Sequence, residues 1–147
     1  MVNVPITKFA ANAPLDANAL PGVAKLIGFR LSAVGNGEAV VELDSGPQHY
    51  SPMGTVHGGV FCDIADAAMG VAFASPLGVH QSFTTLELKI NFSRPVWESM
   101  LQAKASVTSR GKTVGLIECD VIDANGGLMA RASSTCLVLS GSMAQGR

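Results

Sequence analysis

Two carboxylates, Asp63 and Asp66, lie in the most apolar stretch of the chain, GTVHGGVFCDIADAAMGVAFA at residues 54–74. No lysine or arginine occurs between Arg30 and Lys89, so no cation close in sequence neutralises them. Residues three apart lie near one face of a helix, and an ionised carboxylate is costly to bury without a partner. Asp66 is therefore a candidate functional carboxylate, whereas Asp63 is explained equally well as a solvated group.

A histidine and two glycines precede the acids at the expected start of the same helix. The unpaired N–H groups of a helix N-terminus favour negative charge, and glycine lets a ligand oxygen approach the backbone. Gly58 and Gly59 therefore form a candidate oxyanion site, although such a pair also simply eases packing. His57 is better explained as a helix cap or a packed histidine than as an acid–base group. A catalytic triad is unsupported, because no serine or cysteine beside His57 forms a nucleophile elbow.

The distance between the two candidate sites predicts an oligomer. Gly58 and Asp66 are eight residues apart, which corresponds to about 12 Å along a helix. They cannot both contact one small reacting centre unless a second copy of the helix lies antiparallel across a two-fold axis. We therefore expect a C2 dimer whose two equivalent sites each combine one Gly58 with the partner copy's Asp66.

The elements that must position these residues follow an α+β order. A short helix is expected around residues 17–29, two strands flank the GNG turn at 35–37, and one helix spans 57–74. Four strands follow, with turns at 109–112 and 123–127. In TLELKINF, at 85–92, apolar and polar residues alternate strictly, which places Leu86, Leu88, Ile90 and Phe92 on one face.

The long helix is expected to be buried, because it is apolar almost all round. Its expected core residues, at three- and four-residue spacings, are Phe61, Ile64, Ala65, Ala68, Met69, Ala72 and Phe73. Such a helix requires an antiparallel sheet that curls around it. We expect a flexible arm over 1–16, a single domain over 17–140 and a disordered tail over 141–147.

Composition narrows the functional class. The chain has 147 residues, about half of them apolar, and only 14% are charged, where about a quarter is typical, which favours an oligomer. A net charge of −1 indicates no nucleic-acid or membrane partner. No apolar run of 18 residues and no secretory signal occurs, so a cytoplasmic location is expected.

The three cysteines, Cys62, Cys119 and Cys136, lack metal-binding spacing and are expected to be free thiols.

The motifs together resemble a known family. YSPMGTVHGGVFCDIADAAMGVA, FTTLELKINFSRPV and the later DANGGLMARASST resemble the hotdog-fold acyl-CoA thioesterases of the phenylacetate-degradation type, within the 4-hydroxybenzoyl-CoA thioesterase group. The similarity runs from about residue 18 to residue 138. It implies a long central helix wrapped by a curved antiparallel sheet, in a homodimer at least, with a homotetramer expected.

The resemblance also implies roles for individual residues. Asp66 would be the general base or nucleophile, Gly58 would polarise the thioester carbonyl through its N–H, and Thr85, with Thr84 beside it, would position water. The family usually has an asparagine six residues before the histidine, where this chain has Ser51. Gln48 is a candidate substitute for that asparagine. Asp63 corresponds to no functional residue of the family pattern.

The implied activity is hydrolysis of an acyl- or aryl-acyl-CoA to the free acid and CoA. No cofactor or metal is expected, since CoA is part of the substrate. Its phosphates require cations, for which Arg110, Lys112 and Arg131 are candidates, although they are equally consistent with ordinary solvated charges. Phe61, Met69, Phe73 and Met53 are candidates for the acyl pocket. Two alternatives stay open: a non-catalytic acyl-CoA-binding module, and a hotdog hydratase or dehydratase.

Overall fold

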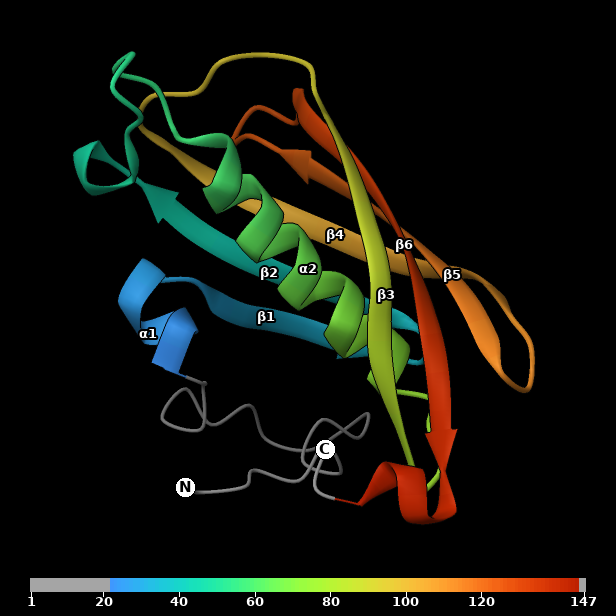
Figure 1. The fold of residues 1–147 in the computed structure, drawn as a ribbon. Coiled ribbons are helices and arrows are strands. Elements are labelled where there is room, and N and C mark those ends of the chain that lie inside the picture. Colours follow the sequence, from blue (N-terminus) through green and yellow to red (C-terminus); the bar gives the residue numbers. More distant parts are fainter. Residues whose placement is uncertain (1–21, 146–147) are drawn as a thin grey trace.

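The computed structural model describes residues 22–145, and their elements follow the predicted order (Figure 1). The helices are α1 (Gly22–Ile27) and α2 (Gly58–Ala74), with short 3-10 helices η3 (Pro47–His49) and η4 (Gly141–Ala144). The strands are β1 (Arg30–Gly35), β2 (Glu38–Ser45), β3 (Gln81–Phe92), β4 (Ser99–Arg110), β5 (Val114–Ile122) and β6 (Leu128–Ser140).

The six strands form one antiparallel sheet in the order β1-β2-β4-β5-β6-β3. The sheet curls around α2, which lies across its inner face (Figure 1). The long strand β3 stands at one edge, and it reaches that position by crossing from the end of α2 to pair with β6. This arrangement confirms the predicted α+β class with a long central helix.

The core between α2 and the sheet contains the residues that helical spacing predicted. All seven are buried: Phe61, Ile64, Ala65, Ala68, Met69, Ala72 and Phe73. Phe73 packs edge-on against Phe83 of β3 with ring centroids 5.5 Å apart. It also lies so close to Gly115 of β5 that any side chain at Gly115 would collide with its ring. This end of α2 is therefore tightly packed against the sheet.

Two details differ from the sequence prediction. The pairing of β3 with β6 shifts register between Thr85 and Glu87, so Leu86 is the extra residue of a β-bulge and is 56% exposed. The strict alternation predicted over 85–92 therefore fails at Leu86. Residues 141–144, predicted as disordered tail, form η4, which packs against β3 and β6. The predicted arm at 1–16 and the start of the domain at 17 lie outside the described residues.

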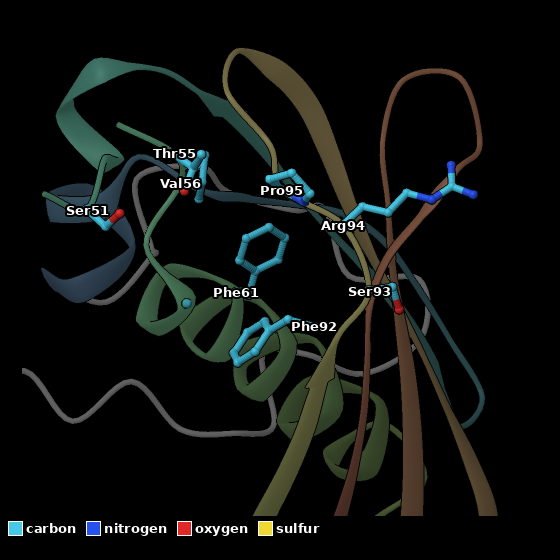
Figure 2. A pocket seen from close by; sticks show the side chains of 9 residues that line it. Ser51, Thr55, Val56, Phe61, Phe92, Ser93, Arg94 and Pro95 are labelled. Carbon is cyan, nitrogen blue, oxygen red and sulfur yellow. The ribbon is translucent and has the colours of Figure 1, made fainter. Parts of the chain in front are cut away.

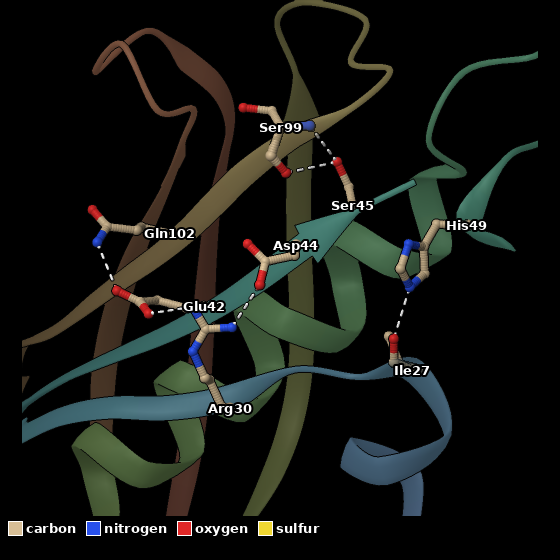
Figure 3. Close-up of polar contacts among 8 residues, drawn as sticks. All are labelled: Ile27, Arg30, Glu42, Asp44, Ser45, His49, Ser99 and Gln102. Carbon is tan, nitrogen blue, oxygen red and sulfur yellow. Dashed lines mark hydrogen bonds and ion pairs between the residues drawn. The ribbon is translucent and has the colours of Figure 1, made fainter. Parts of the chain in front are cut away.

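Polar contacts anchor the segment that leads from β2 to α2 (Figure 3). The buried His49 accepts a hydrogen bond from the Gly46 N–H at Nδ1, and its Nε2 lies 2.7 Å from the carbonyl oxygen of Ile27. A neutral imidazole with its proton on Nε2 satisfies both contacts. Ser45 bridges to Ser99 of β4, with its Oγ donating to the Ser99 carbonyl and accepting from the Ser99 N–H. These bonds fix the chain just before it enters the loop at 50–57.

Candidate active site

The N-terminus of α2 carries one capped and one uncapped N–H group. His57 is the N-cap, and its Nδ1 accepts a hydrogen bond of 2.9 Å from the Gly59 N–H. The structure thus supports the interpretation of His57 as a helix cap. The Gly59 N–H is occupied by its hydrogen bond to His57. The Gly58 N–H donates to no acceptor within residues 22–145. It is the free donor of this helix end, where the helix dipole favours a negative charge.

A cavity of about 470 Å³ opens at this helix end. Figure 2 shows that its lining residues come from the loop before α2, from α2 itself, and from the end of β3 with the loop that follows it. The rings of Phe61 and Phe92 form the apolar wall, edge-to-face at 6.0 Å between centroids. The full lining is Ser51, Thr55, Val56, Gly58, Phe61, Phe92, Ser93, Arg94 and Pro95. An apolar pocket with a few polar groups at its edge is typical of a small-molecule site.

Asp66 lies two helical turns beyond Gly58 on α2 and is absent from the lining of this cavity. Its residue surface is exposed in the single chain. The protein packed around the carboxyl group nevertheless raises the pKa of Asp66, and the neighbouring charge of Asp63 raises it further. Neither acid takes part in an ion pair within the described part of the chain. No cation therefore offsets the raised pKa of Asp66.

The two threonines of β3 face opposite sides of the sheet. Thr85 pairs directly with Cys136 of β6, and its Oγ1 lies 3.8 Å from the Cys136 Sγ, which is buried in the core beside α2. Thr84 pairs with Leu137 and, by strand alternation, faces the outer side. Only Thr85 of the two threonines therefore shares the α2 side of the sheet with the candidate site.

The remaining predicted site residues are dispersed. Ser51 lines the cavity, and its Oγ accepts from the Met53 N–H, which leaves the hydroxyl proton free. Gln48 is exposed and does not line the cavity. Met53, a candidate for the acyl pocket, is 89% exposed, whereas Met69 and Phe73 belong to the closed core.

The three predicted phosphate-binding cations lie away from this cavity. Arg110 donates to the carbonyl oxygen of Pro76, beyond the far end of α2. Lys112 is exposed in the turn between β4 and β5. Arg131 forms a bidentate pair with Asp120 at 2.6 and 2.8 Å, which lowers the pKa of Asp120. None of the three lines the cavity in the described chain.

Sequence reasoning did not identify Thr55, Phe92 and Arg94 as pocket residues. The alternation over 85–92 predicts that Phe92 shares a face with Leu88 and Ile90 but does not predict its place in the cavity wall. Arg94 belongs to the cavity lining, and its guanidinium extends away from Pro95 and from the rings of Phe61 and Phe92 (Figure 2). The signal that could have identified Arg94 is the sequence NFSRP, where a cation stands two residues after the last aromatic residue of the alternating strand.

Other kinds of site find no support in the geometry. Within residues 22–145, no group of three or more His, Cys, Asp or Glu side chains is placed to hold a metal ion. All three thiols are free, and burial raises the pKa of Cys119 to about 12. None of the helices described is both long and apolar enough to cross a membrane.

Comparison with known proteins identifies the family of the chain. The family model of the thioesterase superfamily matches residues 53–130, a span that includes Gly58, Asp66 and Thr85. A Saccharolobus solfataricus protein named as a candidate esterase is 30% identical over 115 residues, 78% of this chain and 81% of that protein. The 1,4-dihydroxy-2-naphthoyl-CoA hydrolase of Listeria monocytogenes is 26% identical over 117 residues, 80% of this chain and 95% of that enzyme.

A solved structure adds the fold. The PaaI protein of the phenylacetic acid degradation operon of E. coli superposes with a TM-score of 0.77 at 24% identity, over 82% of this chain and 86% of that chain. This likeness confirms the predicted wrapped-helix architecture, and the family match confirms the predicted relationship. The chain therefore belongs to the thioesterase superfamily and has the hotdog fold.

Proposed function

We propose that this protein hydrolyses an acyl-CoA thioester to the free acid and CoA. The observation that carries the proposal is the free N–H of Gly58, which stands at the N-terminus of α2 beside an apolar cavity. A thioester carbonyl bound there gains negative charge when water attacks it. An N–H group placed in advance at that position stabilises the oxyanion, and loss of one such donor typically costs about 100–1,000-fold in rate.

Asp66 supplies the second requirement of the reaction, a base for the attacking water. Water adds to the carbonyl carbon while the carboxylate of Asp66 takes its proton, and the tetrahedral intermediate then expels the CoA thiolate. The raised pKa of Asp66 suits it to accept a proton. Direct attack by the carboxylate, through an acyl-enzyme anhydride, is the other route open to the same side chain.

The spacing on α2 supports a site shared between two copies. Gly58 and Asp66 belong to the same helix, about 12 Å apart along its axis. The cavity at Gly58 lacks Asp66 within one chain. A two-fold partner with an antiparallel α2 would supply the missing carboxylate. We therefore propose a homodimer as the smallest active unit, assembled further into a homotetramer.

The substrate has two parts, the acyl group and CoA, and different side chains would bind each of them. Phe61 and Phe92 present aromatic surface to the acyl group, and aromatic rings pair favourably with one another. The Listeria relative is named as a hydrolase of an aryl-CoA, which supports an aromatic acyl group as the first candidate here. Arg94 in the cavity lining is the first candidate cation for the CoA phosphates. Arg110, Lys112 and Arg131 stay predictions, because none of them lines this cavity.

The proposal is tested by the release of free CoA thiol from a panel of aromatic and straight-chain acyl-CoAs. We expect turnover with at least one of them, and loss of turnover in Asp66→Asn. The neighbouring Asp63→Asn variant is the matched control, because it removes the same charge three residues away and should retain activity. Absence of CoA release from every substrate would remove the enzymatic proposal and leave the binding-module alternative. Full activity of Asp66→Asn would overturn the assignment of the base.

A further inference from the structure

The β-bulge of β3 lies next to the proposed water-positioning residue. Thr85 pairs with Cys136 and Glu87 pairs with Thr135, so Leu86 has no partner on β6. An extra residue reverses the alternation of the strand. As a result Thr85 and Leu88, which are three residues apart, both face α2. In a regular strand, residues three apart face opposite sides of the sheet. Bulges of this kind occur beside active sites, where they redirect a side chain.

Three consecutive residues of β6 hold the bulge. Ser134, only 2% exposed, donates from Oγ to the carbonyl oxygen of Glu87 at 2.8 Å. On the other face of the sheet, Thr135 donates from Oγ1 to the Glu87 carboxylate, also at 2.8 Å. Cys136 brings its Sγ to 3.8 Å from the Oγ1 of Thr85. We call Ser134, Thr135 and Cys136 the β6 clamp.

We propose that the β6 clamp positions the Thr85 hydroxyl for the reaction, with the Cys136 thiol donating its hydrogen bond to Thr85 Oγ1. Ser134 and Thr135 fix the bulge, and Cys136 fixes the hydroxyl itself. This inference rests on the proposed thioester hydrolysis, in which Thr85 orients the attacking water. The clamp residues act through Thr85 and are positioning residues.

The direction of the Cys136 hydrogen bond follows from the chemistry of the two groups. A thiol is a weak donor, and its sulfur is also a weak acceptor. Thr85 is exposed, so its O–H has water oxygen available as a better acceptor than sulfur. When the thiol donates to Oγ1, the single Thr85 proton stays free for the site. Cys136 is 1% exposed, so its thiol has little access to water as an alternative acceptor.

The charges near Cys136 keep its proton in place. Burial raises the pKa of the Cys136 thiol, and the carboxylates of Asp66 and Glu87 raise it further. Hydrogen bonding with the Thr85 and Ser134 side chains lowers this pKa in part but leaves it raised. The thiol therefore remains a donor at neutral pH.

The hydrogen bond is tested without any substrate. The infrared S–H stretch of Cys136 is identified by the difference between wild type and Cys136→Ser. We expect this band to move to higher frequency in Thr85→Val, because the thiol then loses its acceptor. The S–H bands of Cys62 and Cys119 should not move and serve as internal controls. An unmoved Cys136 band would overturn the proposed donation.

The positioning role is tested by a double-mutant cycle in acyl-CoA hydrolysis. Cys136→Ala should lower kcat about two- to threefold, the low end for one hydrogen bond because a thiol is a weak donor, with KM nearly unchanged. Cys136→Ser, which retains a donor, should recover most of the loss. In a Thr85→Val background, Cys136→Ala should cause no further loss. Cys119→Ala removes another buried thiol of the same core and should leave kcat unchanged.

The outcomes separate the two proposals. If Thr85→Val and Cys136→Ala each lower kcat and the two fold-losses multiply in the double variant, the two residues act independently. That result would overturn the positioning role, even if hydrolysis is real. A wild-type protein that releases no CoA would remove the proposed function. In that case the infrared band still decides whether the clamp orients Thr85. If Cys136→Ala does not fold, the conservative Cys136→Ser variant and the infrared band of Thr85→Val carry the test.

Discussion

Phe92 of β3 covers Gly58 of α2 so closely that a Cβ atom on residue 58 would lie 3.0 Å from the Cζ atom of Phe92. The contact joins residues 34 positions apart in the sequence and brings the end of β3 to the start of α2. It places an aromatic ring beside the free N–H of the proposed oxyanion site. Gly58 is thus required by the close approach of a ring, since its backbone conformation is ordinary helix.

Gly58→Ala should therefore impair hydrolysis without unfolding the protein. The new methyl group would push the Phe92 ring toward the cavity, and small displacements in a reacting site cost up to about 100-fold in rate. Thermal stability should not fall, because alanine is a better helix former than glycine. We expect kcat/KM to drop about tenfold or more, measured by CoA release.

The double variant Gly58→Ala/Phe92→Leu provides the control, since leucine lacks the atom that the methyl group would meet. It should recover part of the lost kcat/KM. Gly70→Ala, a glycine replacement elsewhere on α2, should keep full activity. A double variant no better than Gly58→Ala alone would show that the contact with Phe92 is not the cause.

Phe92→Ala should change the choice of substrate. The ring is 55% exposed and forms one wall of the cavity with Phe61, so its removal enlarges the cavity at little cost to folding. We expect kcat/KM for bulky acyl groups to rise relative to compact aromatic ones by about tenfold, the usual effect of a changed pocket wall. Leu86→Ala removes a side chain of the same strand with nearly equal exposure, 56%. That control should leave the substrate preference unchanged.

The sequence was sufficient to predict the elements, because their signals are local. The spacing of Phe61, Ile64 and Ala68 predicts which face of α2 is buried, and the turns at 109–112 and 123–127 separate the last strands. His57 before two glycines predicts the start of the helix, which the N-cap confirms. The assignment of Asp66 as a functional carboxylate rests on its apolar surroundings in the sequence and stays a prediction.

The parts that escaped prediction depend on contacts between distant segments. The bulge at Leu86 is fixed by β6, some 50 residues further along the chain, and nothing in TLELKINF itself marks it. The cavity forms where the end of β3 meets the start of α2. Phe92 and Arg94 therefore line it through contacts between segments that are distant in the sequence. The pairing of Arg131 with Asp120 is equally a cross-strand contact between β5 and β6.

The pH profile should depend on Asp63. Burial raises the pKa of Asp66 first, and the charge of Asp63 raises it further. The base must be ionised to work, so kcat/KM should rise with pH through the pKa of Asp66. Asp63→Asn removes the neighbouring negative charge, which makes ionisation easier and should move the acidic limb to lower pH. Asp63→Glu, which keeps the charge, should leave the limb near its original position, and a limb that stays fixed in Asp63→Asn would contradict the coupling.

Asp66→Asn should stabilise the protein at neutral pH. The pKa of Asp66 lies above its ordinary value of 3.8 in the folded state, so the folded protein binds more protons than the unfolded chain in the interval between the two pKa values. Stability therefore falls as pH rises through that interval. Melting curves should show a higher Tm for Asp66→Asn at neutral pH, and the difference should shrink below about pH 4. A Tm gain that is the same at all pH values would exclude ionisation of Asp66 as its cause.

A shared site predicts complementation between two variants that are each strongly impaired. Asp66→Asn destroys the base on one copy and Gly58→Ala impairs the oxyanion site on the other. If each site combines Gly58 of one copy with Asp66 of its partner, a mixed dimer contains one site with both defects and one intact site. Random exchange of equal amounts should therefore restore about a quarter of wild-type activity, since half of the dimers are mixed.

Co-expression of the two variants with different affinity tags allows the mixed dimer to be isolated and assayed by itself. It should show about half of wild-type kcat per dimer, with sedimentation confirming its size. If instead both groups of a site came from the same chain, every site in the mixture would carry one defect. The mixture would then show only the average of the two low activities. Complementation thus decides between a shared and a single-chain site without requiring the identity of the acyl group beyond one working substrate.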